Sequence, residues 1–466
     1  MASLWTAGDA ATATGGSSNT NWTATGVSID SRSLAAGDLF VALRGPNHDG
    51  HDFVDAALER GAVAAMVDRE IVHLSTAPLL RVDDTLVGLA ALGAAGRNRS
   101  DARIIAVTGS VGKTSTKEAL RLALASCNST FASVGGLNNH WGAPLSLARL
   151  PPEAAYGIFE LGMNHAGEIA ALARLVRPHI AVITTIEPAH LGFFPSMRAI
   201  ADAKAEIFLG LEPGGVAVLN RDNPHFAQLA AAGRACAAEV VSFGTHPEAT
   251  VRLVDYLLEP RGSIFDVALP GLALRCQLPM PGRHWVMNAL AVLAAVAAAG
   301  ADPRRAVEVL AGLEELPGRG RRYELSWQGG SLTLLDESYN ASPAAMRAAL
   351  AVLAAIPPAT GTRRVAVLGD MLELGEATER LHRELAEPLA GSGVDRVFLV
   401  GRAVAALHDA LPDSKRGGLW PTADEAIPEL LRFLRAGDVV TVKGSRGIGL
   451  GFIVERLRAE SARTET

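Results

Sequence analysis

The stretch Val107-Thr-Gly-Ser-Val-Gly-Lys-Thr-Ser115 decides the expected fold. The apolar run Ile104 to Val107 before it predicts a short buried strand. Thr116 to Ala125 predicts a helix, with Leu120 and Leu124 at helical spacing. The glycine-rich turn between strand and helix brings free backbone N–H groups together with the positive end of a helix dipole. The stretch therefore predicts a cradle for the phosphates of a nucleotide.

Two side chains of this stretch indicate the chemistry of the bound nucleotide. Lys113 has the place of a lysine that reaches the outer phosphates, and Thr114 that of a hydroxyl that holds Mg²⁺. The motif is shorter than a full Walker A motif, because Val107 stands where a glycine is required five positions before Gly112. A chance glycine-rich turn is the alternative, but a Lys-Thr-Ser sequence directly behind a β-run argues against it.

Length and composition place the chain among globular enzymes. Its 466 residues predict about three domains, and 49% hydrophobic against 20% charged residues excludes a disordered chain. The net charge of -6 gives no general attraction to nucleic acid or to a membrane surface. Three widely spaced cysteines, Cys127, Cys236 and Cys276, predict no disulfide framework and no zinc site.

The sequence also predicts a cytoplasmic location. Met1 to Thr6 lacks the basic and apolar regions of a signal peptide. The longest uncharged apolar run, Ala289 to Ala301, is too short to cross a bilayer. We therefore expect a cytoplasmic enzyme that acts on small molecules, with no nucleic-acid partner and no membrane insertion.

The order of predicted elements divides the chain into three α/β domains. Residues 1–83 alternate short strands with a helix, as in a small α/β domain. Residues 84–316 repeat strand and helix around the phosphate motif, which predicts a mostly parallel sheet with helices on both faces and an antiparallel flap over 252–278. A Pro/Gly/Arg hinge at 317–322 opens the last domain, a Rossmann-like doubly wound unit over 317–466.

Polar residues follow two further predicted strands of the central domain. Glu160 comes at the end of a strand over 155–159, and Glu187-Pro-Ala-His190 follows a strand over 180–186. In open α/β sheets, ligands bind outside the carboxyl ends of the strands. We therefore expect Glu160 and His190 to lie on one rim with the phosphate cradle.

The helix predicted over 196–211 carries a lysine on its apolar face. Lys204 shares that face with Ile200, Ile207 and Phe208 by its spacing. Such a lysine either extends its ammonium to the surface, or lies at the active-site rim as a neutral, reactive amine with a lowered pKa. Periodicity alone favours the first alternative.

In their order, the motifs of this chain resemble those of the Mur ligase family along nearly its whole length. The motifs that carry the resemblance are Gly26-Val-Ser-Ile-Asp-Ser-Arg32, Gly37-Asp-Leu-Phe-Val-Ala-Leu43, Asp49-Gly-His51, Thr108-Gly-Ser-Val-Gly-Lys-Thr114, Asn138-Asn139, Glu160-Leu-Gly-Met-Asn164, Ala189-His-Leu191, Ala203-Lys-Ala-Glu206, Pro281-Gly-Arg-His284 with Asn288, Tyr339-Asn-Ala-Ser-Pro343, Leu368-Gly-Asp-Met-Leu-Glu-Leu-Gly375 and Lys443-Gly-Ser-Arg446. The resemblance is to the branch that adds D-alanyl-D-alanine, because the Asp-Asn-Pro-Arg motif of the diaminopimelate-adding branch is not found. Two positions depart from the family pattern: Glu337 replaces a second aspartate and keeps its charge, and Ser342 replaces an asparagine and keeps a helix cap.

The resemblance implies ATP-driven amide formation. ATP would phosphorylate the terminal carboxylate of UDP-N-acetylmuramoyl-tripeptide, and the amine of D-alanyl-D-alanine would displace the phosphate. The product, UDP-N-acetylmuramoyl-pentapeptide, serves peptidoglycan synthesis and so cell shape and division. The resemblance further implies two Mg²⁺ ions, and we expect a monomer.

The resemblance also implies roles for individual residues. Catalysis is expected from Lys113, Glu160, His190 and Lys204, and the metal ligands would be Thr114, Glu160, His190 and a carbamylated Lys204. The nucleotide is expected to contact Thr108, Gly109, Ser110, Val111, Gly112, Lys113, Thr114, Ser115, Asn288, Arg319 and Asp336. The expected substrate contacts are Asp30, Ser31, Arg32, Asp49 and His51 at the uridine diphosphate end, and Asn138, Asn139, Tyr339, Asn340 and Arg446 near the carboxylate and the amine.

Three alternatives remain at this stage. A sister amide ligase, such as an earlier Mur ligase or a folylpolyglutamate synthetase, would differ in its substrates. A nucleotide-dependent switch or plain ATPase would release phosphate without an amine acceptor. A UDP-sugar-binding scaffold without catalysis is disfavoured by the complete set of Lys113, Glu160, His190 and Lys204.

Overall fold

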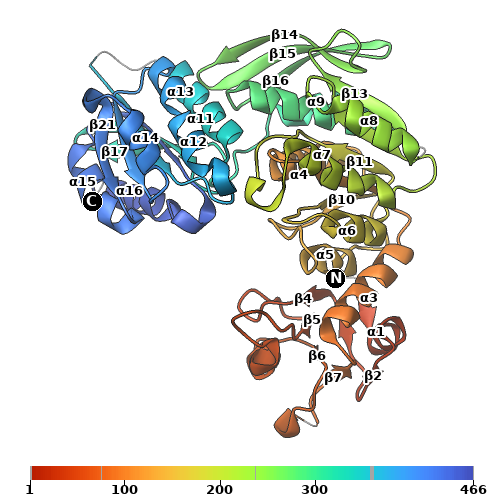
Figure 1. Ribbon diagram of the computed structural model, residues 1–466. Helices are drawn as coiled ribbons and strands as arrows, with labels where there is room; N and C mark the ends of the chain where they lie inside the picture. Colours follow the sequence, from red (N-terminus) through yellow and green to blue (C-terminus); the bar gives the residue numbers. More distant parts are fainter. Residues whose placement is uncertain (1–2, 75, 237, 357–360, 465–466) are drawn as a thin grey trace.

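The computed structural model describes residues 3–464 except 75, 237 and 357–360. Figure 1 shows three α/β units in a bent row, with the N-terminal unit at the bottom, the central unit at the right and the C-terminal unit at the left. Each unit is built around its own sheet. The predicted α/β fold class with three units is confirmed.

The N-terminal unit has a sheet in the order β2-β7-β6-β5-β4, whose last four strands are parallel. The strands of this sheet are β2 (Ser17–Ser18), β4 (Gly26–Ser28), β5 (Asp38–Val41), β6 (Ala64–Val67) and β7 (Leu79–Arg81). A separate antiparallel pair is formed by β1 (Trp5–Thr6) and β3 (Thr23–Ala24). The helices of the unit are α1 (Ala7–Thr14), the 3₁₀ helices η1 (Gly50–Phe53) and η2 (Val72–Leu74), and α2 (Val54–Glu59). Helix α1 was not predicted from the sequence. Its side chains Ala7 and Ala10 pack into the core of this unit.

The central unit has a sheet in the order β16-β15-β14-β13-β12-β11-β8-β10-β9. Its strands are β8 (Arg103–Thr108), β9 (Thr130–Ala132), β10 (Tyr156–Glu160), β11 (Ile180–Ile183), β12 (Val216–Asn220), β13 (Glu239–Gly244), β14 (Val251–Glu259), β15 (Gly262–Leu269) and β16 (Leu272–Leu278). Its helices are α3 (Thr85–Asn98), α4 (Lys113–Ala125), α5 (Gly142–Ala148), α6 (Glu168–Val176), η3 (Leu191–Phe193), α7 (Met197–Ala205), η4 (Glu206–Gly210), α8 (Phe226–Ala235), α9 (Arg283–Ala298) and α10 (Pro303–Leu310).

Strand β8 shows why helices cover both faces of the central sheet. Its side chains alternate, so that Ile105 and Val107 pack with α4 and α9, while Ile104 and Ala106 pack with α5, α6 and α7 on the other face. The neighbours β10 and β11 are both parallel to β8. The carboxyl ends of these three strands therefore meet at one edge, as the sequence predicted.

The antiparallel flap is confirmed as β14, β15 and β16. It does not form a separate sheet, because β14 pairs with the end of β13 in parallel at Phe243 and Gly244. Figure 1 shows this flap at the top of the molecule, beside α9.

The C-terminal unit has a sheet in the order β17-β18-β22-β19-β20-β21. Its strands are β17 (Arg321–Trp327), β18 (Gly330–Glu337), β19 (Arg364–Gly369), β20 (Arg396–Val400), β21 (Arg416–Trp420) and β22 (Val439–Lys443). Its helices are α11 (Pro343–Ala355), η5 (Gly375–Ala377), α12 (Thr378–Arg383), α13 (Ala386–Gly391), α14 (Ala405–Ala410), η6 (Asp413–Lys415), α15 (Ala423–Phe433), η7 (Arg446–Ile448) and α16 (Gly451–Thr464). The predicted cap of α11 is confirmed, since the Ser342 hydroxyl accepts the Ala345 N–H.

Three element boundaries differ from the prediction for identifiable reasons. Helix α4 begins at Lys113 rather than Thr116, because the left-handed Gly112 ends the turn directly before it. The helix predicted over 196–211 continues as the 3₁₀ helix η4 after Ala205. The predicted hinge at 317–322 runs into β17, which pairs antiparallel with β18.

The three cysteines Cys127, Cys236 and Cys276 are free thiols. None of the helices in the described part of the chain is both long and apolar enough to cross a membrane.

A buried histidine in the C-terminal unit is expected to make the stability of the protein depend on pH. The ring of His382 is fully buried; its Nδ1 lies 2.7 Å from the Thr378 carbonyl oxygen, and its Nε2 accepts the Met371 N–H at 2.9 Å. Burial lowers the pKa of His382 below its ordinary value of 6.5. The unfolded chain therefore binds a proton that the folded chain resists, and this residue reduces the free energy of unfolding as pH falls below about 6.5.

We expect the melting temperature to fall between pH 7.5 and pH 5.5, and to fall less in a His382→Gln variant. Scanning calorimetry at both pH values tests this. An equal fall in both proteins would mean that other groups carry the whole pH dependence.

Candidate active site

The glycine-rich turn between β8 and α4 forms the predicted cradle. Gly109 and Gly112 both have left-handed backbone angles, with φ of 147° and 83°. A Cβ at Gly109 would lie 1.9 Å from the Thr184 hydroxyl, and one at Gly112 would lie 2.6 Å from the Asn288 side-chain oxygen. Neither position can hold a larger residue. The turn therefore brings Asn288, from α9, directly against the loop expected to hold phosphate.

The cradle is joined to the loop that carries His190. The Ser110 N–H donates to the Thr185 carbonyl at 2.9 Å, and the Ser110 hydroxyl donates to the Glu187 carbonyl at 2.9 Å. The Glu187 N–H in turn donates to that hydroxyl at 3.0 Å. The loop after β11 is thus fixed to the cradle.

Lys113 is the first residue of α4 and folds back over the cradle. Its Nζ donates to the Gly109 carbonyl at 2.9 Å. Burial lowers the pKa of Lys113, nearby Arg319 lowers it further, and Glu160 opposes both. Lys113 is therefore within electrostatic range of Glu160 and of Arg319, which belongs to the segment before β17.

Glu160 ends β10 beside the cradle and is almost fully buried, at 2% exposure. One carboxylate oxygen accepts the Thr114 hydroxyl at 2.8 Å, and the other accepts the Asn138 side-chain amide at 2.8 Å. Asn138, predicted to contact substrate, here orients Glu160. The Ser133 hydroxyl also accepts the Glu160 N–H at 3.2 Å. The carboxylate is therefore held rigidly next to the Thr114 hydroxyl.

The pair Thr114 and Glu160 fits Mg²⁺. Both supply hard oxygen donors, and Mg²⁺ binds through one or two protein oxygens together with water and substrate phosphates. In the described residues, no group of three or more His, Cys, Asp or Glu side chains could hold a metal ion by itself. Such a site depends on the nucleotide for its remaining ligands.

His190 follows β11 in a left-handed conformation, with φ of 60°. Its Nδ1 lies 2.6 Å from a carboxylate oxygen of Glu373, which comes from the C-terminal unit. Burial lowers the pKa of His190, Glu373 opposes this shift, and Lys113 and Lys204 add to it. His190 therefore lies within the electrostatic range of Lys113 and Lys204. The strand-end argument predicted its place on the rim with the phosphate cradle, but not the approach of Lys204.

Periodicity alone favoured a Lys204 side chain that extends to the surface. The structure shows instead that this side chain is buried. Its side chain is 2% exposed on α7, in a helix face with buried Ile200, Ile207 and Phe208. Within the described residues, Lys204 forms no ion pair with an acidic group. Burial lowers the pKa of Lys204 well below 10.5, and Lys113 adds to the shift. Burial therefore favours the uncharged form of the Lys204 amine, within electrostatic range of Lys113.

The residues expected around the rest of the nucleotide lie at the junction with the C-terminal unit. The Arg319 guanidinium lies 4.1 Å from the centre of the Tyr339 ring. Asp336, at the end of β18, accepts the Gly318 N–H at 2.8 Å and both donors of Ser338. These bonds fix the turn that presents Arg319.

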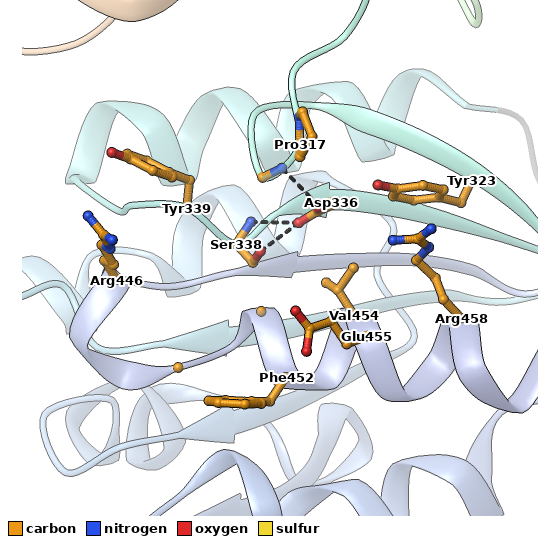
Figure 2. A pocket seen from close by; sticks show the side chains of 13 residues that line it. Pro317, Tyr323, Asp336, Ser338, Tyr339, Arg446, Phe452, Val454, Glu455 and Arg458 are labelled. Atoms are coloured by element: carbon orange, nitrogen blue, oxygen red, sulfur yellow. Dashed lines mark hydrogen bonds between the residues drawn. The ribbon is translucent and has the colours of Figure 1, made fainter. Parts of the chain in front are cut away.

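Figure 2 shows the pocket beside this turn, between β18 and α16. Its volume is about 350 Å³, and Asp336, Tyr339 and Arg446 are among its lining residues. The figure places Tyr339 and Arg446 at one end and Tyr323 and Arg458 at the other. Two expected substrate residues are thus brought together here.

The other expected substrate residues near the amine have local roles in the structure. The Asn139 side chain accepts the N–H groups of Trp141 and Gly142 at the start of α5. Asn340 is exposed, and its side-chain oxygen accepts the N–H of Ala341. The Tyr339 hydroxyl lies beside Gly136, since a Cβ there would be 2.9 Å from it. Tyr339 therefore joins the C-terminal unit to the loop before Asn138.

The polar turns of the N-terminal unit lie apart from the cradle, in the lower unit of Figure 1. Arg32 forms a two-pronged pair with Asp30, at 2.9 and 2.8 Å, and is exposed. His51 is buried at 4% exposure, where its ring lies 2.6 Å from Asp49 and accepts the Asp68 N–H. His51 therefore shapes the Asp49 turn from inside, while Asp30, Ser31 and Arg32 border the solvent.

Sequence reasoning missed two residues of the site. Lys117 is fully buried on α4, and its Nζ donates to the carbonyls of Ser133 and Gly135 at 2.6 and 2.9 Å. It stands four residues after Lys113, on the same helix face, which was a usable signal. Glu373 follows the carboxyl end of β19 within the quoted Gly369–Gly375 motif, but its partner lies on another unit.

Comparison with known proteins identifies related chains. Three family models match successive parts of the sequence: "Mur ligase family, catalytic domain" at residues 23–112, "Mur ligase middle domain" at 107–296, and "Mur ligase, glutamate ligase domain" at 318–446. The chain is 37% identical over 438 residues to UDP-N-acetylmuramoyl-tripeptide–D-alanyl-D-alanine ligase of Escherichia coli strain K12, covering 93% of each chain.

Solved structures agree with this relationship. The fold superimposes on a crystal structure of MurF from Acinetobacter baumannii with a TM-score of 0.85 and 31% identity, over 98% of this chain and 99% of the other. It also superimposes on MurF ligase from Thermotoga maritima in complex with ADP, with a TM-score of 0.78 and 27% identity, over 94% and 98% of the two chains.

Proposed function

The chain belongs to the Mur ligase family, and from this premise we propose that it is the ligase that adds D-alanyl-D-alanine to UDP-N-acetylmuramoyl-tripeptide with ATP. The observation that carries the proposal is the near full-length similarity to enzymes of that name, at 93% coverage of both chains. The clustering of Lys113, Glu160, His190 and Lys204 at one sheet edge supports it. The product supplies peptidoglycan synthesis.

The reaction requires a carboxylate to become an electrophile. A carboxylate resists attack because oxide would have to leave, so its oxygen first takes the γ-phosphoryl group of ATP and ADP is released. The amine of D-alanyl-D-alanine then forms the amide bond to the acyl carbon, the bond to the phosphate oxygen breaks, and the amine loses a proton. The carboxylate oxygen that accepted the phosphoryl group leaves as part of the phosphate.

The residues of the cradle suit the first step. Lys113 places a cation at the mouth of the turn, where charge on the transferring phosphoryl group would be stabilised. Thr114, Glu160 and His190, with Lys204, would hold Mg²⁺, which when bound neutralises phosphate charge. Asn288 and Arg319 lie where they can contact the nucleotide beside the cradle.

We propose that Lys204 acts as a carbamate. A neutral lysine amine adds to CO₂, forming an N–C bond and releasing a proton, and the product is an anion of carboxylate character. The burial of Lys204 and the absence of an acidic partner among the described residues favour that neutral amine. An anion there would also offset the positive charge of Lys113.

The C-terminal unit would exclude water from the acyl phosphate. Tyr339 reaches the loop at Gly136, and Glu373 reaches His190. Movement about residues 316–318, at the start of the predicted hinge and before β17, would make and break these contacts. We take the functional domains as 1–83 for the UDP end, 84–316 for ATP and 317–466 for closure and the acceptor. We also propose a monomer in the cytoplasm.

The test is release of ADP and phosphate from ATP with Mg²⁺, with UDP-N-acetylmuramoyl-tripeptide and D-alanyl-D-alanine added singly and together. Tripeptides ending in lysine and in meso-diaminopimelate should both be offered. We expect release that requires both substrates, with one new amide for each ATP. Release that ignores the dipeptide would move the assignment to a sister ligase or to a nucleotide switch.

A further inference from the structure

Two left-handed residues face each other between the central and the C-terminal unit. His190 has φ of 60° and Glu373 has φ of 65°, and Nδ1 of the ring lies 2.6 Å from the carboxylate. The main chains also interlock, because the Gly192 N–H donates to the Glu373 carbonyl at 2.8 Å. A Cβ at Gly375 would lie 2.8 Å from the Gly192 Cα. The contact therefore includes the main chains of the two turns, and does not consist of the two side chains alone.

The segment that leads into Glu373 is held by hydrogen bonds from several elements of the C-terminal unit. The Asp370 carboxylate accepts the N–H groups of Arg402 and Val404 at 3.0 and 2.8 Å. The Leu372 N–H donates to the Ser445 hydroxyl at 2.9 Å. Together with the bond from Met371 to buried His382, these contacts hold the three residues that precede the left-handed Glu373.

A left-handed backbone conformation, as at His190 and Glu373, is strained and persists only where the surrounding structure enforces it. Left-handed conformations are unfavourable for residues other than glycine, and they concentrate at functional sites. The side chain of Glu373 is 43% exposed, so an ion pair there adds little stability by itself. Stability of the fold therefore does not account for two such residues meeting at this point.

The contact decides which nitrogen of His190 carries the proton. A bare nitrogen and a carboxylate oxygen would repel each other at 2.6 Å, so Nδ1 holds the hydrogen. The oxygen lies out of line with the N–H direction, and the contact is an electrostatic one without an aligned hydrogen bond. When the ring is uncharged, Nε2 is then the nitrogen that keeps a lone pair and can accept a ligand.

We propose that Glu373 is a positioning residue that orients His190 across the interface, so that the C-terminal unit completes the active site of the central unit. The proposal rests on the function proposed above, in which His190 acts at the phosphate cradle. If Glu373 has this role, closure of the C-terminal unit and assembly of the active site occur together. The acyl phosphate would then form only where water has already been excluded.

Glu373→Ala, Glu373→Gln and a control, Glu376→Gln, test the proposal. Glu376 is exposed and lies three residues further along the same segment. We expect kcat to fall about 10–100-fold in Glu373→Ala, as for other residues that orient a ligand histidine. The KM for UDP-N-acetylmuramoyl-tripeptide should stay nearly constant. Glu373→Gln should recover part of kcat, and the control should match the wild type.

A second readout separates positioning from a structural role. Selective ¹⁵N-histidine labelling reports the protonated nitrogen of His190, with its signals identified through a His190→Gln variant. We expect the Nδ1-protonated form in the wild type and a mixture of tautomers in Glu373→Ala, with other histidine signals unchanged. Unchanged His190 signals, or an unchanged kcat, would overturn the proposal.

The same spectra separate this inference from the proposed function. If the wild type shows no ligation with any tripeptide while His190 still changes tautomer in Glu373→Ala, the function fails and the positioning contact stands. If ligation is normal and His190 does not respond, the positioning role fails alone.

Discussion

Lys113→Ala is expected to abolish ligation while the protein remains folded. The Lys113 cation lies at the mouth of the cradle, where negative charge develops on the transferred phosphoryl group. A preorganised cation at that position stabilises the transition state and increases the rate by a large factor. We expect kcat/KM to fall by at least about 10³-fold. The fold should persist, because Nζ donates to one main-chain carbonyl, that of Gly109, and Glu160 keeps its hydrogen bonds from Thr114 and Asn138.

The measurement combines turnover with a thermal melt and ADP affinity. Lys415→Ala is the matched control, since Lys415 also donates to a main-chain carbonyl, that of Val394 at 2.9 Å, but in the C-terminal unit. We expect near-native turnover in the control and weaker ADP binding in Lys113→Ala alone. A Lys113→Ala enzyme with a near-native rate would mean that the turn does not hold the reacting phosphate.

The geometry around Lys113 could be predicted from local sequence because a parallel sheet imposes it. Glu160 and His190 follow strands β10 and β11, which both neighbour β8, so their approach to the cradle needs no knowledge of side-chain packing. The Gly109 and Gly112 conformations follow similarly from the motif. These parts of the site depend on parallel strands whose carboxyl ends share one edge, and the repeated alternation of strand and helix predicts such a sheet, although not the order of its strands.

Other features depend on contacts that no local pattern contains. Periodicity places Lys204 on the apolar face of its helix, but the length of its side chain leaves open whether the amine reaches solvent. The pairing of His190 with Glu373 requires the relative position of two units. Strand β17 was hidden by the glycines and arginines before it, which are typical of a hinge and here lead directly into an edge strand.

Lys204→Ala is the second change with a large expected effect. If the lysine serves as a carbamate, alanine removes an anion beside the cradle and leaves a cavity in its place. We expect a loss of about 10²–10³-fold in kcat, in the range found when one electrostatic contact to a reacting group is lost. Formate or acetate, which can enter the cavity, should restore part of the rate. An unchanged rate would mean that Lys204 has only a packing role.

Lys204 should also affect the pH dependence of the free energy of unfolding, which can be measured without any turnover. Because burial lowers the pKa of Lys204, the folded chain disfavours a proton that the unfolded chain binds below pH 10.5. In CO₂-free buffer, its contribution to the free energy of unfolding therefore rises as pH is raised from 7 toward 9.

Lys204→Met keeps the volume but has no amine, so its melting temperature should be higher at pH 7 and less dependent on pH. Bicarbonate should stabilise the wild type only. If bicarbonate raised both melting temperatures equally, the ion would be acting elsewhere, and the carbamate would lose its support even if the Lys204→Ala enzyme were slow.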